Sequence, residues 1–151
     1  MLAIFGAKQK KEGLTVKIYQ AGPLFTEADR DWHKKFSSAL NNKGHISIWP
    51  GDLFDDGHLL SLGSKAKDRI FEKCRNTIDE CDVVVALLDG TQVDDGTSWE
   101  IGYAFAKHSP IYGIRTDFRN GGDTNHSMVN CMIECSCKEV AKCISDLIAL
   151  L

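Results

Sequence analysis

The residues best suited to chemistry lie in one short stretch, 94–105, which places carboxylates next to a turn and a helix. Residues 94–96, Asp-Asp-Gly, are typical of a turn, because these residue types tolerate the backbone conformations that turns need. Apolar side chains then recur at three- and four-residue spacing, which predicts a helix over 97–108. Glu100 would lie in its first turn, where a carboxylate can act as a nucleophile on an electron-poor carbon.

A simpler alternative is that these residues only begin a helix. Thr97 and Glu100 have the spacing of a capping box, in which both side chains bind free backbone N–H groups. Asp94 and Asp95 would then be a loop acid and a helix N-cap. Spacing alone leaves both interpretations open.

The elements before this stretch would place Glu100 at a cleft. An apolar, β-branched run predicts a buried strand over 82–89, and ligands of open α/β sheets bind beyond the carboxyl ends of such strands. The helix N-terminus is expected to favour the ionised form of Glu100. Tyr19, in a strand predicted over 16–21, has two open interpretations: a donor whose hydroxyl orients Glu100, or an aromatic on the sheet face without a polar partner.

The remaining pattern alternates strands and helices. The predicted strands are 16–21, 45–49, 82–89, 111–115 and a short one near 133–136. The predicted helices run from Thr26 or Glu27 to about Leu40, over 65–80, over 97–108 and near the end of 128–151. In the last of these helices, an apolar stripe is formed by Val140, Ile144, Leu147 and Ile148. In the helix over 65–80, Ile70, Cys74, Thr77 and Ile78 are expected to point inward. Residues 52–64 are predicted to be a loop over the active face.

This alternation predicts a single-domain α/β fold: a flavodoxin-like, doubly wound and mainly parallel sheet of about five strands with helices on both faces. Residues 1–13 are interpreted as a polar N-terminal tail and 14–151 as the domain. We expect a cytoplasmic protein, because the beginning of the chain lacks the pattern of a secretion signal. A net charge of -3 and the lack of a long apolar run argue against nucleic acid polymers and membranes as partners.

Metal and cofactor chemistry have little support in the sequence. The six cysteines form no Cys-x-x-Cys pair, and the five histidines show no helical i, i+4 pairing. Glycine-rich dinucleotide and phosphate loops and the Gly-x-Ser-x-Gly motif are also missing from the sequence. We therefore expect neither a metal nor a cofactor.

The string Asp-Asp-Gly-Thr-Ser-Trp-Glu-Ile-Gly-Tyr-Ala at 94–104 resembles the signature of nucleoside 2-deoxyribosyltransferases. Weaker similarities lie at 18–25, 81–86 and 130–133, so the resemblance spans residues 16 to about 133. It implies that Glu100 is a nucleophile that forms a covalent deoxyribosyl intermediate, and that the sugar then passes to another nucleobase. The implied partners are a 2′-deoxynucleoside and a free purine or pyrimidine base.

The same resemblance implies roles for other residues. Tyr19 would orient Glu100, while Gly22 and Gly96 would contact substrate from the loops that carry them. Asn130 would reach the sugar in a neighbouring subunit, which implies a homo-oligomer, a dimer or a multiple of dimers, with shared active sites. Met128, Val129, Met132 and Ile133 flank that amide, and exposed apolar residues suit an interface.

Two positions bear on specificity. Asp94 would hold the sugar; a carboxylate there repels a 5′-phosphate, and relatives that hydrolyse deoxynucleoside monophosphates carry Ser instead. Cys74 stands where several family members have an Asp that helps to bind the base, and a thiol is a weaker hydrogen-bond donor. Cys74 is therefore a candidate substrate-binding residue with an uncertain effect on base choice.

Two alternative functions remain open. Attack of water on the same intermediate would make the protein a deoxynucleoside or deoxynucleoside 5′-monophosphate N-glycosidase. A more distant alternative is a flavodoxin-like signalling or nucleotide-binding module, in which Asp89 would end the third strand as a phosphoacceptor does.

Overall fold

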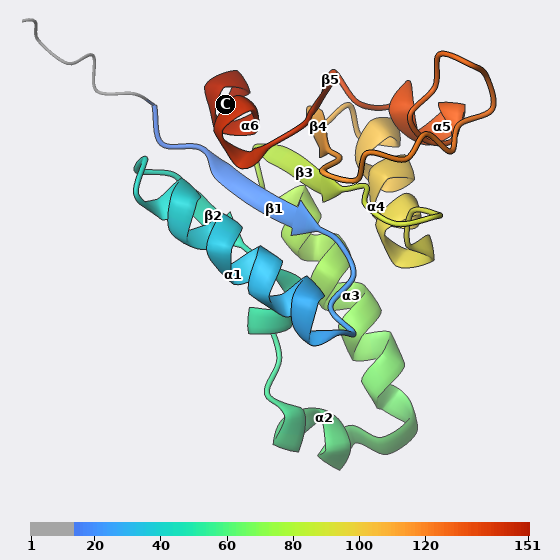
Figure 1. The fold of residues 1–151 in the computed structure, drawn as a ribbon. Helices are drawn as coiled ribbons and strands as arrows, with labels where there is room; N and C mark the ends of the chain where they lie inside the picture. Colours follow the sequence, from blue (N-terminus) through green and yellow to red (C-terminus); the bar gives the residue numbers. More distant parts are fainter. Residues whose placement is uncertain (1–13) are drawn as a thin grey trace, which may run out of the picture.

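Five short strands form one parallel sheet in the computed structural model, which describes residues 14–151 (Figure 1). The predicted tail, 1–13, lies outside the described residues. The strands are β1 (Lys17–Ala21), β2 (Ile46–Ile48), β3 (Val83–Leu87), β4 (Ile111–Ile114) and β5 (Glu139–Ala141). Their order is β2-β1-β3-β4-β5 and every neighbouring pair is parallel, which confirms the predicted flavodoxin-like α/β fold.

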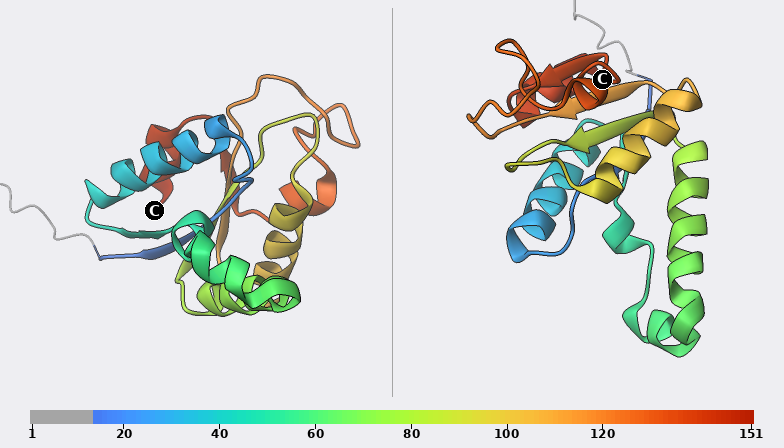
Figure 2. Two further views of the ribbon diagram at one scale, coloured as in Figure 1. Left: turned by 90° about the horizontal axis from the view of Figure 1, so that it is seen from below. Right: turned by 90° about the vertical axis from the view of Figure 1, so that its right-hand side faces the viewer.

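Helices cover both faces of the sheet, as predicted (Figures 1 and 2). One face packs against α1 (Glu27–Asn41) and α6 (Ile144–Leu150), and the other against α3 (Ala66–Asp79) and α4 (Asp95–Ala106). Successive strand residues point to opposite faces, so Ile18 joins the α1 side and Tyr19 the α4 side. This alternation directs the Tyr19 side chain toward the helix that carries Glu100.

Helix α1 begins and ends where its sequence predicts. Thr26 and Asp29 form a capping box at its start, with Asp29 N donating to Thr26 Oγ1 at 3.1 Å and Thr26 N donating to Asp29 Oδ2 at 2.9 Å. Phe36 and Leu40 are fully buried against the sheet. The chain leaves the helix through Gly44, whose φ of 85° lies in the left-handed region that glycine adopts most easily.

The prediction of a loop over 52–64 is wrong, because two short 3₁₀ turns, η1 (Pro50–Asp52) and η2 (Gly63–Lys65), flank helix α2 (Asp56–Leu62). The Asp55 carboxylate caps α2 by accepting from His58 N at 2.8 Å. None of the α2 residues is buried, so the segment lacks the apolar periodicity that makes a helix recognisable. Figure 2 shows α2 standing away from the sheet at the distal end of α3.

The C-terminal part also differs from expectation. The strand predicted near 133–136 is wrong: that segment falls in and after α5 (Cys131–Glu134), and β5 lies three residues beyond it. Val140, predicted in the final helical stripe, belongs to β5. Both elements are too short for periodicity to separate a helix from a strand.

Two smaller corrections concern helix positions. Ile70, predicted to point inward, is 39% exposed, because α3 extends beyond the sheet at its N-terminal end (Figure 1). Helix α4 begins at Asp95 rather than Thr97, so Glu100 lies in its second turn. In the part of the chain from 14 to 151, no helix combines the length and the apolar character needed to cross a membrane.

Two glycines allow a paired test of this packing. A Cβ at Gly113 in β4 would lie 2.7 Å from Leu88 Cδ1 and 3.1 Å from Val140 Cγ2, whereas a Cβ at Gly102 in α4 meets nothing within 4 Å. Gly113→Ala should lower the free energy of unfolding by about 1–3 kcal/mol through overpacking. Gly102→Ala should raise it by about 0.5–1 kcal/mol through helix propensity. Urea unfolding of both variants measures this, and equal effects would contradict the described packing of β4.

Candidate active site

Tyr19, in the middle of β1, contacts Glu100 of α4, although the two residues lie 81 positions apart in the sequence. Tyr19 in β1 is opposite Val84 in the neighbouring strand β3, and α4 follows β3 along the chain. The Tyr19 hydroxyl donates a hydrogen bond to Glu100 Oε1 at 2.5 Å. The structure therefore brings together the two residues that the sequence singled out for catalysis.

Burial controls the ionisation of Glu100. It raises the pKa of the Glu100 carboxyl to about 7; the hydrogen bond from Tyr19 lowers this pKa, and the nearby charge of Asp94 raises it. Desolvation is the largest influence on this carboxyl, and it opposes the ionisation that a helix N-terminus favours. The expected effect of the helix N-terminus itself stays a prediction.

Tyr19 stays a hydrogen-bond donor. Its side chain is fully buried, and burial, followed by the neighbouring Glu100 charge, raises the pKa of its phenol far above the ordinary value. The hydroxyl therefore remains protonated at any working pH. A permanent donor holds one carboxylate oxygen and leaves the other free for a substrate.

Asp94, and not Thr97 with Glu100, caps helix α4. Asp94 Oδ2 accepts from Thr97 N at 2.9 Å and from Thr97 Oγ1 at 3.0 Å. The predicted capping box is therefore wrong, and so is the prediction that Asp95 could be the N-cap. Because Asp94 performs the capping, the Glu100 carboxylate is not committed to backbone groups and faces the cavity beside it.

A cavity of about 360 Å³ opens in front of Glu100. Gly22, Cys74, Asp94, Gly96 and Glu100, all predicted from the sequence as site residues, line it together. Its other walls are mostly apolar and were not predicted: Leu24 and Phe25 from the β1–α1 loop, Phe54 and Leu59 from the α2 segment, and Ile70 from α3. A mostly apolar cavity that also presents carboxylates suits a nucleoside, which joins an aromatic base to a sugar.

Two glycines let the backbone close one side of this cavity. A Cβ at Gly22 would lie 2.6 Å from His33 Nε2, and one at Gly51 would lie 2.3 Å from the Trp49 ring. The His33 and Trp49 rings are buried and stacked behind these glycines, with centroids 5.2 Å apart. Burial lowers the pKa of His33 to about 4, so the imidazole behind Gly22 stays neutral. The sequence did not point to His33, because an isolated His in a helix carries no sequence signal.

Cys74 lies close enough to Tyr19 and Glu100 for the three groups to affect one another's ionisation. Burial raises the pKa of the Cys74 thiol, while its hydrogen bond with Tyr19 lowers it. The group is therefore an uncharged thiol at neutral pH, next to the nucleophile candidate but weak as a hydrogen-bond donor.

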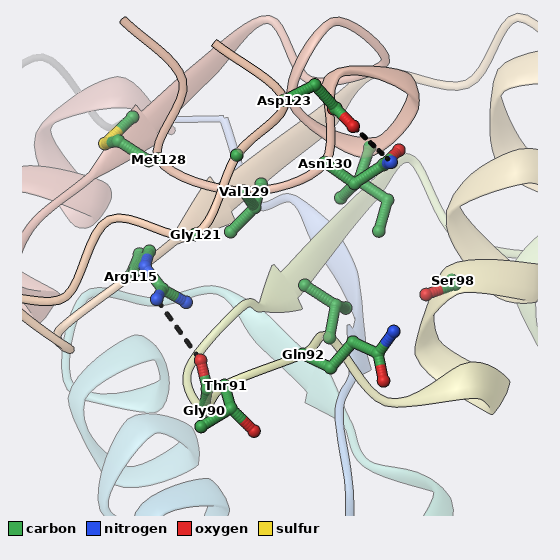
Figure 3. Close-up of a pocket in the computed structure, with 13 residues that line it drawn as sticks. Gly90, Thr91, Gln92, Ser98, Arg115, Gly121, Asp123, Met128, Val129 and Asn130 are labelled. Carbon is green, nitrogen blue, oxygen red and sulfur yellow. Dashed lines mark hydrogen bonds between the residues drawn. The ribbon is translucent and has the colours of Figure 1, made fainter. Parts of the chain in front are cut away.

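Asn130 lies elsewhere in the chain, in a second cavity of about 540 Å³ (Figure 3). It begins helix α5: its Oδ1 accepts from Met132 N at 3.0 Å and its Nδ2 donates to Asp123 Oδ1 at 3.3 Å. Arg115, only 2% exposed, donates to Gly90 O at 3.2 Å in the same cavity. Among the predicted site residues, Asn130 is the one that this chain does not bring to Glu100.

Asp89 has a structural task in the loops beyond β3. Its carboxylate accepts from Thr116 N at 2.6 Å and from Asp117 N at 2.9 Å, which ties the β3 end to the loop after β4. Both oxygens are occupied, since Thr116 Oγ1 donates to the second one. This arrangement gives no support to a phosphoacceptor. Among residues 14–151, moreover, no three Asp, Glu, His or Cys side chains are grouped so that they could hold a metal ion.

Comparison with known proteins identifies the class. The family model of nucleoside 2-deoxyribosyltransferases matches residues 18–132. A curated relative, the uncharacterized protein UU063 of Ureaplasma parvum serovar 3, is 37% identical over 116 residues, which cover 69% of this chain and 72% of that protein. The chain therefore belongs to the nucleoside 2-deoxyribosyltransferase family.

Solved structures share the fold. A 2-deoxyribosyltransferase from Bacillus psychrosaccharolyticus superposes with a TM-score of 0.72 at 22% identity, covering 87% of this chain and 89% of that one. The CMP N-glycosidase BcmB of Clostridium botulinum superposes with a TM-score of 0.58 at 17% identity, covering 89% of this chain and 99% of that one. The fold thus occurs in a transferase and in a glycosidase.

The ionisation of Glu100 gives a prediction for pH dependence. If the carboxylate is the reactive form, kcat/KM for base release should rise with pH through a midpoint near 7. Tyr19→Phe removes the hydrogen bond that lowers this pKa, so its midpoint should move to higher pH. A pH–rate profile of both proteins measures the shift, and an unmoved midpoint in Tyr19→Phe would show that this bond does not control Glu100.

The same pKa predicts a stability effect of defined sign. The folded-state pKa of Glu100, about 7, lies above its ordinary value of 4.5, so the folded protein binds this proton more tightly than the unfolded chain does. The stabilisation is complete below about 4.5 and is lost as the pH rises through 7. Glu100→Gln should therefore raise Tm relative to the wild type more at pH 8 than at pH 5. Thermal melts at both values check this, and a pH-independent difference would contradict the raised pKa.

Proposed function

We propose that this protein is a deoxyribosyltransferase that cleaves the N-glycosidic bond of 2′-deoxyribonucleosides and transfers the sugar to another nucleobase. The observation that carries the proposal is the partly buried Glu100 carboxylate, held by the Tyr19 hydroxyl at 2.5 Å and facing a nucleoside-sized cavity. A structural glutamate at a surface cap would not be desolvated in this way. Membership of the family supports the same substrate class.

The chemistry follows from the geometry of Glu100. Its free carboxylate oxygen attacks C1′ of the deoxyribose; the C1′–N bond breaks, and its electron pair leaves with the base, which takes up a proton from solvent water. A ring nitrogen of the incoming base then attacks C1′, the C1′–oxygen ester bond breaks, and the base gives up its N–H proton to solvent water. Glu100 is thereby regenerated as a carboxylate. Tyr19 fixes the carboxylate orientation through both steps without changing its own protonation state.

The charge around the cavity favours nucleosides over nucleotides. Asp56, Asp94 and Glu100 all line it, while no Lys or Arg of the described residues does. A 5′-phosphate placed there would meet like charge without a cationic partner. This distribution of charge supports the expectation that Asp94 lies at the sugar edge and that a free 5′-hydroxyl is preferred.

Hydrolysis is the second candidate function. The α2 segment supplies part of the cavity wall but has no buried residue, and Phe25 on the opposite wall is 73% exposed. Such a wall excludes water less completely than a packed one, and water that reaches the intermediate would release free deoxyribose. Products formed from deoxyinosine with and without added adenine distinguish transfer from hydrolysis.

Replacement of Glu100 tests the proposal directly. Glu100→Gln retains the size and the hydrogen bond to Tyr19 but removes the nucleophile, so base exchange should fall by roughly 10³-fold or more. Unfolding in urea should show an intact fold. Base exchange is measured by chromatography of reactions that contain deoxyinosine and adenine. Parallel reactions with deoxyinosine 5′-monophosphate test the preference for nucleosides over nucleotides. If Glu100→Gln retained more than about a tenth of the wild-type rate, Glu100 would have no nucleophilic role.

Asn130 is proposed to complete the site of a second subunit. Within its own chain it lines a separate cavity, and Met132 beside it is 76% exposed, as expected of residues that meet a partner. Asn130→Ala and Glu100→Ala proteins should each be inactive, but mixed subunits of a symmetric dimer should regain about a quarter of the sites.

The control for this experiment is proof of subunit exchange by mass spectrometry. A mixture of Met132→Ala protein and Glu100→Ala protein serves as a comparison. Its activity should stay close to the activity that the Met132→Ala protein alone contributes, because Met132 provides contact area and no hydrogen bond to the sugar. Exchange without recovery in the Asn130→Ala mixture would place Asn130 outside the partner's site.

A further inference from the structure

Asp56 lies in the wall of the Glu100 cavity that is farthest from the sheet. It is the first residue of α2, and α2 stands at the distal end of α3, while α4 begins beside the sheet (Figures 1 and 2). Asp56 and Glu100 line the same cavity of about 360 Å³. The two carboxylates therefore line the cavity from different elements, α2 and α4.

The Asp56 carboxylate is free for a ligand within the described part of the chain. The other polar groups of the cavity already have partners: Glu100 binds Tyr19, and Asp94 binds Thr97. The cap of α2 is supplied by Asp55, whose carboxylate accepts from His58 N at 2.8 Å. Asp56 is exposed and makes neither a hydrogen bond nor an ion pair among residues 14–151, so within the described residues its structural role is limited to that of an acid in the first turn of α2.

The proposed function orients the substrate in this cavity. Glu100 must lie beneath C1′ and Asp94 beside the sugar, so the base extends away from the sheet, between the apolar walls. Cys74, another polar group of the cavity wall, is a half-buried thiol, and thiols make weak hydrogen bonds. The edge of the base then reaches the α2 wall, to which Asp56 is the one charged residue that α2 contributes.

We propose that Asp56 reads the edge of the nucleobase and makes the protein selective for guanine-type bases; this inference rests on the proposed function. A carboxylate has two acceptor oxygens and no donor when ionised. Guanine presents two adjacent donors, N1–H and the 2-amino group, which can bind both oxygens together. Hypoxanthine, thymine and uracil offer a ring N–H alone, and adenine and cytosine offer an amino group beside a ring acceptor that faces the carboxylate unfavourably.

Deoxyguanosine and deoxyinosine form a matched pair for the test, because they differ only by the 2-amino group. A second hydrogen bond in a bidentate pair should make kcat/KM for base release from deoxyguanosine about 5- to 100-fold higher than from deoxyinosine. Asp56→Asn, which keeps one acceptor oxygen, should lower that ratio, and Asp56→Ala should bring it near one. Asp55→Asn is the control: Asn also caps a helix, so α2 and the ratio should be preserved.

Binding provides a readout separate from catalysis. In the Glu100→Gln background, calorimetry should show tighter binding of deoxyguanosine than of deoxyinosine, and Asp56→Ala should remove the difference. Equal use and equal binding of the two nucleosides by protein with native Asp56, or an undiminished preference in Asp56→Ala, would overturn the inference. If the wild type released no base from any deoxynucleoside, the proposed function would fail, while the binding ratio would still decide the role of Asp56.

Discussion

The hydrogen bond from Tyr19 to Glu100 is the contact on which the candidate site depends. It joins the first strand to the helix after the third strand, and it offsets part of the cost of burying a carboxylate. Burial still leaves the Glu100 pKa near 7. A carboxylate of this kind is less solvated than a surface one. The fold therefore gives up some stability at neutral pH to keep a reactive carboxylate partly desolvated.

Sheet order and capping together make this contact possible. Because β1 lies beside β3, the Tyr19 side chain packs on the face of the sheet that α4 covers. Asp94 then satisfies the helix start through Thr97, which frees Glu100 from that task. The same Asp94 lines the cavity, so one carboxylate serves both the local helix and the proposed sugar edge. Replacing it is therefore expected to affect α4 as well as the substrate.

Much of this arrangement was predictable from the sequence, because apolar runs mark buried strands and the sheet order follows from strand–helix alternation. The pairing of Tyr19 with Glu100 followed from strand ends meeting at one edge. Helix α2 was not predictable, since it buries no residue and so has no apolar period; Asp56 was missed for that reason. The raised pKa of Glu100 was also missed, because desolvation depends on the packed structure and not on the spacing of residues.

The central claim is that the free oxygen of Glu100 becomes covalently bonded to the sugar. Its most direct test is rapid acid quenching of the protein with excess deoxynucleoside, followed by proteolysis and mass spectrometry. The account predicts one added deoxyribosyl group on the peptide that contains Glu100, and none on that peptide from Glu100→Gln. An adduct on another residue would contradict this account. So would turnover without any trapped adduct, measured under conditions in which cleavage precedes release of the sugar.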